Sequence, residues 1–175
     1  MYAAVWGLLG TLVGAFASMA TTWLTTRSSY LLQQEKTREE RGQIARAFQQ
    51  QTLLDLQEAI HDALRLVTRA HIEDSKAAIA TGQWGKSRIS DDLDEEIRLA
   101  HRRVSLLVER VADTNLRMQV KALMSHVAEV LFSSSEREAD HHLSESYKEA
   151  GRAIEAIGTV LRQQFDVAVL PRRQG

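Results

Sequence analysis

Apolar residues recur at alternating spacings of three and four along most of the chain beyond residue 46. This pattern is typical of amphipathic helices that pack through a heptad seam. Four such seams can be read: Leu53, Leu56, Ile60, Ala63, Val67 and Ala70; Leu93, Ile97, Ala100, Val104, Leu107 and Val111; Leu116, Val120, Leu123, Val127 and Val130; and Leu143, Tyr147, Ala150, Ile154, Ile157 and Leu161. Joined by short connections, they predict an all-α protein in which about four antiparallel helices form a bundle with coiled-coil-like seams.

Short polar breaks separate the seams. The sequence Gly-Gln-Trp-Gly at residues 82–85 interrupts the first helix. At residues 112–115 the seam changes phase, which predicts a tight turn between two helices; a bent continuous helix is the alternative. Residues suited to helix amino termini stand at the expected starts of the last three helices: Ser90 or Asp91, Asp113 or Thr114, and Ser135 with Glu138.

The first 26 residues contain no charged side chain, whereas the next stretch is rich in Lys, Arg and Glu. A helix over residues 2–24 would be about 34 Å long, enough to cross a hydrocarbon core of about 30 Å. Basic residues follow this segment and none precedes it, which predicts an outer amino terminus and a cytoplasmic body. Trp6 and Trp23 are placed to sit at the two membrane interfaces. The sequence thus predicts a single-pass anchor.

Two other interpretations of this segment are open. Residues 15–17 and 18–20 have the small-x-small form that signal peptidase cleaves, but the segment is long and lacks a basic start. A buried helix of a soluble protein is the other alternative. The excess of Arg over Lys and the abundant Ala and Leu suggest a bacterial source, so the expected location is the bacterial inner membrane.

Small residues also form a stripe along the predicted anchor. Gly7 lies on it, and Gly10, Gly14 and Ser18 follow the small-x-x-x-small spacing that lets membrane helices approach closely. Such a stripe indicates self-association or docking on another membrane helix, although small residues are common in membrane helices by chance.

These patterns divide the chain into a membrane anchor (1–26), a charged helical stalk (27–45), a helical bundle domain (46–167) and a disordered tail (168–175). The net charge of −1 argues against nucleic-acid binding through overall positive charge. The absence of cysteine excludes disulfides and thiol catalysis. We expect membrane lipid and either a second copy of the chain or another protein as partners.

Candidate chemistry is sparse. Glu58-x-x-His61 and Glu138-x-x-His141 have the spacing that ferritin-like bundles use for two metal ions. If the first and fourth seams are assigned to heptad positions a and d, however, all four side chains lie on outer faces, away from the seams. We therefore expect neither an enzyme nor a cofactor, metal or small-molecule site, and a ferritin-like metalloenzyme is the least favoured hypothesis.

Three further features of the sequence contain histidine or tryptophan. Asp140, His141 and His142 are adjacent and so do not share one helix face, while His126-x-x-Glu129 flanks the third seam at an interfacial or exposed position. Trp84 lies between two glycines, where it is either a contact for a partner or a ring that folds back over the end of the bundle.

Four stretches together resemble small uncharacterised bacterial proteins with one amino-terminal membrane helix and a cytoplasmic helical body: Trp6-Gly-Leu-Leu-Gly10, the sequence Thr-Thr-Trp-Leu at 21–24, His101-Arg-Arg-Val-Ser-Leu-Leu and Gly151-Arg-Ala-Ile-Glu-Ala-Ile. The resemblance implies a fold and a location but no activity. The favoured hypothesis is a membrane-anchored interaction or regulatory module that self-associates or recruits a protein partner. The alternative is a membrane-perturbing toxin or phage-defence effector that assembles through its anchor.

Overall fold

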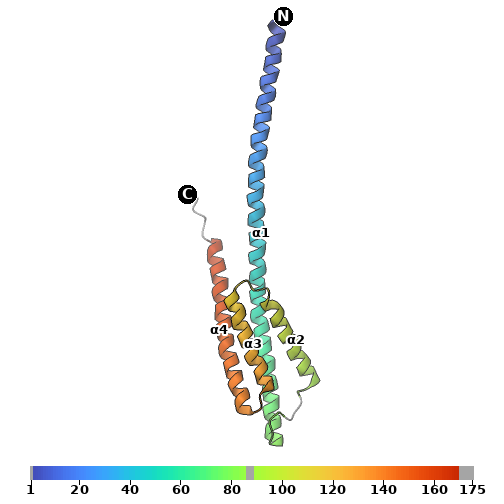
Figure 1. The fold of residues 1–175 in the computed structure, drawn as a ribbon, viewed down its shortest axis with the longest axis vertical. Helices are drawn as coiled ribbons and strands as arrows, with labels where there is room; N and C mark the ends of the chain where they lie inside the picture. Colours follow the sequence, from blue (N-terminus) through green and yellow to red (C-terminus); the bar gives the residue numbers. More distant parts are fainter. Residues whose placement is uncertain (1, 86–88, 170–175) are drawn as a thin grey trace. The chain divides into compact units, whose positions relative to one another are not determined.

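The computed structural model describes the backbone of residues 2–85 and 89–169 (Figure 1). Side-chain surroundings are described for residues 18–19, 22–23, 33–34, 36–85 and 89–163. The chain is all-helical over the described backbone, with four helices: α1 (Tyr2–Thr81), α2 (Asp91–Val108), α3 (Thr114–Phe132) and α4 (Glu136–Val169). It divides into two compact units, residues 1–45 and 46–175.

The first unit consists of the amino-terminal part of α1. Its described side chains are almost all exposed, including Met19 and Trp23. Within the fully described part of the chain, no helix combines the length and hydropathy needed to cross a bilayer. The surroundings of Trp6, Gly7, Gly10 and Gly14 are not among those described.

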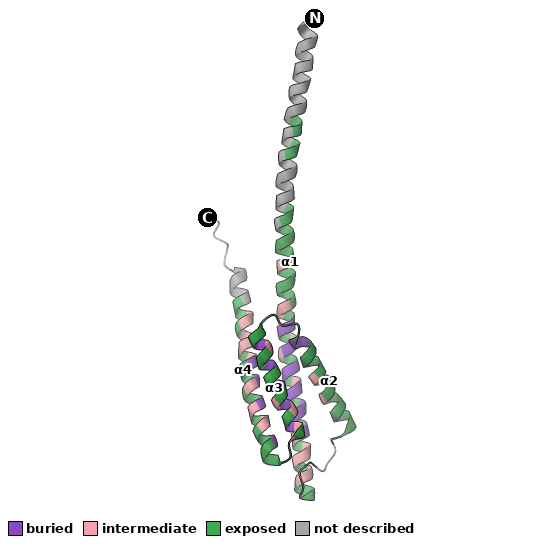
Figure 2. Ribbon diagram, in the orientation of Figure 1, coloured by how far each residue is buried: buried purple, intermediate pink, exposed green. Residues whose placement is uncertain are grey.

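The second unit is a bundle in which consecutive helices alternate in direction (Figure 1). Figure 2 shows the buried positions of this unit concentrated where the helices face one another, above all on α1. Every residue predicted for the first and third seams is buried, at 7% exposure or less. In the second seam Leu93, Val104, Leu107 and Val111 are buried, and the remaining two positions are half-buried. The large apolar residues of three seams therefore identify the core faces correctly.

In the fourth seam Ala150 and Ile157 are buried, Leu143, Ile154 and Leu161 are half-buried, and only Tyr147 is exposed, so the buried face of α4 is turned slightly from the predicted one. Tyr147 is 50% exposed, and its hydroxyl shares a hydrogen bond with Thr68 Oγ1 at 2.8 Å. The fully buried positions of α4 are mostly small: Ala139, Ser146, Ala150 and Ala153, with the larger Ile157. Small side chains let α4 approach its neighbours closely, so they occupy the core-facing positions while larger residues pack at the edges. This rotation places His142 toward the interior side of α4.

Local sequence signals fix the connections. The residues at 112–115 form a turn, not a bend in one helix: α2 ends at Val108 and Asp113 caps α3, its Oδ1 accepting from Leu116 N–H at 2.9 Å. Ser90 caps α2, and Ser135 Oγ accepts from Glu138 N–H. The capping box of α4 is shifted, because Glu138 reaches back to the hydroxyl and N–H of Ser134, at 2.8 and 2.9 Å.

The first helix ends at a backbone conformation that glycine adopts more readily than other residues. Gly82 has φ +70°, and its N–H donates to Ala78 O at 2.8 Å. A left-handed residue just beyond the last turn is a common helix terminator, since glycine adopts this conformation without strain. The chain then leaves α1 toward α2 through the Gly82–Gly85 region that the sequence marked as a break.

Candidate functional site

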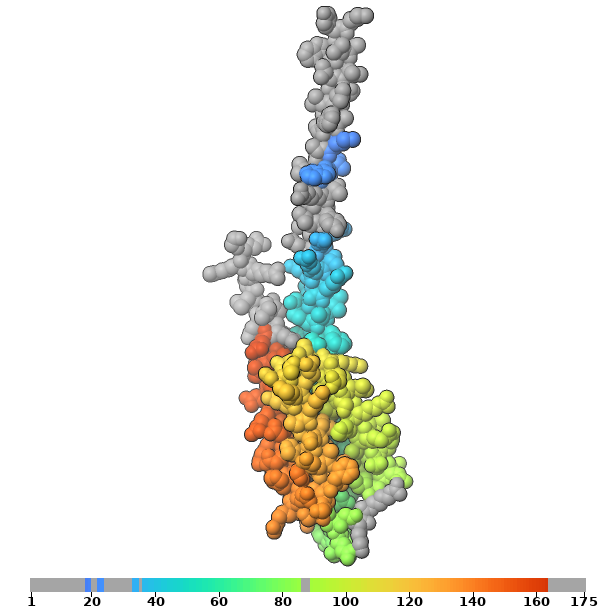
Figure 3. Space-filling model, viewed as in Figure 1, coloured from blue at the N-terminus to red at the C-terminus, as the bar shows by residue number. Residues whose placement is uncertain are grey.

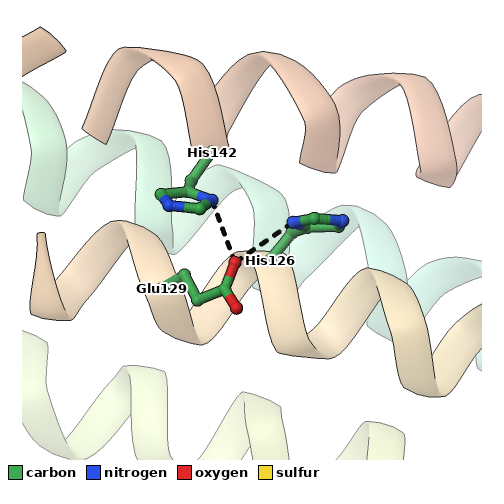
Figure 4. Close-up of side chains that lie close together, drawn as sticks. All are labelled: His126, Glu129 and His142. Atoms are coloured by element: carbon green, nitrogen blue, oxygen red, sulfur yellow. Dashed lines mark hydrogen bonds and ion pairs between the residues drawn. The ribbon is translucent and has the colours of Figure 1, made fainter. Parts of the chain in front are cut away.

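Two helices bring two histidines and one glutamate together at the surface of the bundle (Figure 4). His126 and Glu129 come from α3, and His142 comes from α4. Nδ1 of His126 lies 3.2 Å from Oε2 of Glu129, and Nδ1 of His142 lies 2.9 Å from the same oxygen. One ligand atom from each of the three side chains can be chosen so that all lie within 4.8 Å of one another. Both imidazoles thus converge on one carboxylate oxygen.

The hairpin between α3 and α4 explains this convergence. His126 and Glu129 are three positions apart, so they share a face of α3. His126 lies eight residues before Ser134, and His142 lies eight residues after it. Ser134 itself is in the connection between the two antiparallel helices. Equal distances from the turn place the two histidines at the same level of the hairpin, where their rings lie 6.0 Å apart and nearly stacked.

The site is partly shielded from solvent. The side chain of His142 is 20% exposed, that of His126 is 35% exposed and that of Glu129 is 47% exposed. Nδ1 of His142 is fully buried, and although it lies 2.9 Å from Glu129 Oε2, no hydrogen bond of acceptable direction reaches it. The two atoms are close enough for a hydrogen bond, but their relative direction is unsuitable for one. This nitrogen is therefore close to the carboxylate without being satisfied by it.

Negative charge surrounds the cluster. The Ser134 hydroxyl and the Ser134 N–H hold the pKa of Glu138 below its usual value; burial opposes them, and charge on His142 makes the smallest contribution, which lowers the pKa. Lys148 lowers the pKa of Glu145 mainly through a hydrogen bond; burial opposes this, and charges on Lys148, His141 and His126 add to it. Both carboxylates are thus ionised at neutral pH, and because Glu145 is paired with Lys148 at 2.7 Å, it is Glu138 that adds negative charge near the cluster.

The two Glu-x-x-His pairs predicted to face outward do so. Glu58, His61, Glu138 and His141 are all exposed. Glu58 Oε2 accepts a hydrogen bond from Arg103 of α2 at 2.8 Å, so it participates in an ion pair on the outer surface. The pairs therefore do not meet in the interior of the bundle.

A second cluster, formed by His71, Asp140 and Trp84, lies at the end of the bundle where α1 contacts α4. His71 Nε2 lies 2.9 Å from Asp140 Oδ1, and the ring of His71 lies 5.7 Å from that of Trp84. Trp84 is half-buried and its Nε1 donates to Ser133 O at 3.0 Å. Of its two predicted placements, the folded-back one is observed; a role in binding a partner stays a prediction.

An open groove lies between α2 and α3. It has a volume of about 390 Å³, and its lining combines apolar residues (Val104, Val108, Val120, Met124 and Ala128) with polar ones (His101, Ser105, Glu109, Lys121 and Ser125). Lys121 Nζ and Glu109 Oε1 pair across it at 2.7 Å. Figure 3 shows α2, α3 and α4 side by side on this face of the second unit.

Of the residues predicted to form the small-residue stripe or to lie at the membrane interfaces, only Ser18 and Trp23 have described side chains, and both are exposed. Comparison with protein-family models, curated proteins and solved structures found no match to this chain.

Proposed function

We propose that this protein is a membrane-anchored interaction module, in which an amino-terminal helix in the bacterial inner membrane tethers a cytoplasmic helical bundle. The module acts by self-association or by recruiting a protein partner, and not as an enzyme. Its anchor is the uncharged segment of residues 1–26, whose basic flank favours a cytoplasmic bundle.

The observation that carries this proposal is the continuity of α1. This single helix runs from Tyr2 to Thr81, so the uncharged segment, the charged stalk and the first core helix of the bundle belong to one element. Its carboxyl-terminal part supplies Leu56, Ile60 and Val67, all at 0% exposure, to the core. If this helix left the bundle, these buried side chains would become exposed to water, which is costly. The proposed anchor is therefore continuous with a helix that is held firmly in the core.

Apolar surface on the bundle supports a role in binding. Leu99 and Leu106 are seven positions apart on α2, which places them on one face, and they are 49% and 54% exposed. The α2–α3 groove adds an apolar floor formed by Val104, Val120 and Met124. An amphipathic helix that binds in such a groove uses anchors at spacings of three, four and seven.

Self-association through the anchor is tested by crosslinking the full chain in native membranes. We expect a crosslinked dimer or higher oligomer, because the stripe of Gly7, Gly10, Gly14 and Ser18 allows close helix contact. Gly14→Leu should reduce the crosslinked fraction several-fold. Gly42→Leu is the matched control, since nothing lies within 4 Å of a Cβ built at Gly42.

Recruitment through the bundle is tested in the same membranes with Leu106→Glu, which places a charge on an exposed apolar face. Met118→Glu, at a residue of α3 that is 58% exposed, is its control. Loss of a specific crosslinked product with the first variant alone supports recruitment. A chain that remains monomeric and uncrosslinked in all variants contradicts the proposed function.

A further inference from the structure

We propose that His126, Glu129 and His142 bind one zinc ion, which bridges α3 and α4. This inference is independent of the membrane anchor and changes the expectation, drawn from the sequence alone, that the bundle binds no metal. It rests on the geometry of three side chains, on the buried nitrogen of His142 and on the chemistry of the ligand set.

The distances within the cluster are close to those of a metal site. Ligands of a tetrahedral zinc ion at about 2.1 Å from the metal lie about 3.4 Å from one another. The two nitrogen–oxygen separations here are 3.2 and 2.9 Å, and all three ligand atoms lie within 4.8 Å. Small rotations of the side chains that open the two nitrogen–oxygen separations by a few tenths of an ångström would bring them to the zinc geometry.

The buried Nδ1 of His142 favours a metal over a simple hydrogen-bonded cluster. A protonated Nδ1 would be expected to direct its hydrogen at Glu129 Oε2, yet the 2.9 Å contact lacks that direction. Burying a polar nitrogen without a partner is costly. A cation among the three side chains would instead accept the lone pair of each imidazole and the charge of the carboxylate.

The donor atoms of the three side chains indicate which metal ion would bind. Two imidazoles and one carboxylate suit Zn²⁺, whereas Mg²⁺ and Ca²⁺ prefer ligand sets made entirely of oxygen. Three protein ligands leave a fourth position, and the partial exposure of Glu129 and His126 allows water to fill it. The carboxylate of Glu138 lies close enough to His142 to interact with it electrostatically, so it adds negative potential near the site.

The position of the cluster defines what the ion would do. His126 and Glu129 lie in the second half of α3, and His142 lies in the second turn of α4. An ion held by all three would link the two helices near their connection and restrain their separation. Zinc would therefore stabilise the α3–α4 hairpin.

The test is zinc binding by the full chain, solubilised in detergent and purified without a polyhistidine tag. Competition with a chelator of known affinity should give one zinc ion per chain. His126→Ala, His142→Ala and Glu129→Gln should each weaken binding by about 100-fold or more, since even residues that only support metal ligands cost 10- to 100-fold. His61→Ala, at an exposed histidine of α1, should leave binding unchanged.

A second measurement separates loss of the site from loss of the fold. Cobalt in place of zinc should give visible absorption bands typical of nitrogen-coordinated Co²⁺, and Glu129→Gln should change these bands while far-ultraviolet circular dichroism stays the same. Zinc should also raise the unfolding temperature of the parent chain, and Mg²⁺ should not. The proposal is overturned if the chain binds no zinc at micromolar concentration, or if the three variants bind it as tightly as the parent.

Discussion

Trp84 and Ser133 are 49 positions apart in the sequence, yet the indole Nε1 of Trp84 donates a hydrogen bond to the carbonyl oxygen of Ser133 at 3.0 Å. Ser133 is the C-cap of α3, so its carbonyl belongs to a helix end that lacks intrahelical partners. The bond therefore joins the loop after α1 to the end of α3, and the Trp84 ring packs against the core beside His71.

Replacing Trp84 by phenylalanine should destabilise the bundle modestly. The ring is retained, but the carbonyl of Ser133 loses its donor, at a cost of about 1 kcal/mol. Thermal unfolding of the solubilised chain measures the change. Equal stability of the Trp84→Phe variant and the parent would show that the hydrogen bond contributes nothing net.

The small-residue face of α4 gives a sharper prediction. Ala153 is at 0% exposure, so Ala153→Leu should overpack the core and cost about 1–3 kcal/mol. Gly151→Leu, on the exposed side of the same helix, has open space around its Cβ and should leave stability unchanged or raise it. If both variants had the same stability as the parent, the assignment of the buried face of α4 would be wrong.

The pH dependence of stability should report on the start of α4. The pKa of Glu138 is lowered in the folded chain, chiefly by hydrogen bonds from Ser134. A carboxyl with a lowered folded pKa stabilises the fold above its unfolded pKa, and this contribution is lost as the pH falls through the folded value.

Glu138→Gln should therefore lower the unfolding temperature at pH 7, and the difference from the parent should close at pH values below about 4. Glu155→Gln, at an exposed carboxylate further along α4, is the control. A difference that persisted at low pH would show that Glu138 acts through packing and not through its charge.

Much of the fold could be predicted from the sequence because large apolar residues dominate three of the four core faces. The fourth face could be predicted only in part: Ala150 and Ile157 of the predicted seam are buried, but Tyr147 is 50% exposed and its neighbour Ser146 is buried instead. The choice between them depends on how closely α4 approaches its neighbours, and helical periodicity does not contain that information.

The candidate metal site was missed for the same reason. With Tyr147 placed in the core, His142 falls beside the seam; with Ser146 in the core, it faces α3. The signal that could have found it is the symmetry of His126 and His142 about Ser134, combined with Glu129 three positions after His126. That reasoning requires the turn to be located first, and the Ser-rich connection at residues 133–135 locates it.

The interaction module and the membrane-perturbing effector predict different consequences of expression. A tethered module should leave cell growth and the exclusion of membrane-impermeant dyes unchanged when the full chain is induced. Growth arrest with dye leakage, both abolished by Gly14→Leu and retained by Gly42→Leu, would instead favour an effector that assembles through its anchor.

The central claim is the membrane anchor and its orientation, and the absence of cysteine from the chain makes it directly measurable. Single cysteines introduced by Ala3→Cys, Ser18→Cys and Ser125→Cys can be probed with a membrane-impermeant maleimide in intact spheroplasts, after lysis and in detergent. We predict labelling of residue 3 in intact spheroplasts, of residue 125 only after lysis, and of residue 18 only in detergent. Labelling of residue 18 without detergent, or of residue 125 in intact spheroplasts, would contradict the account.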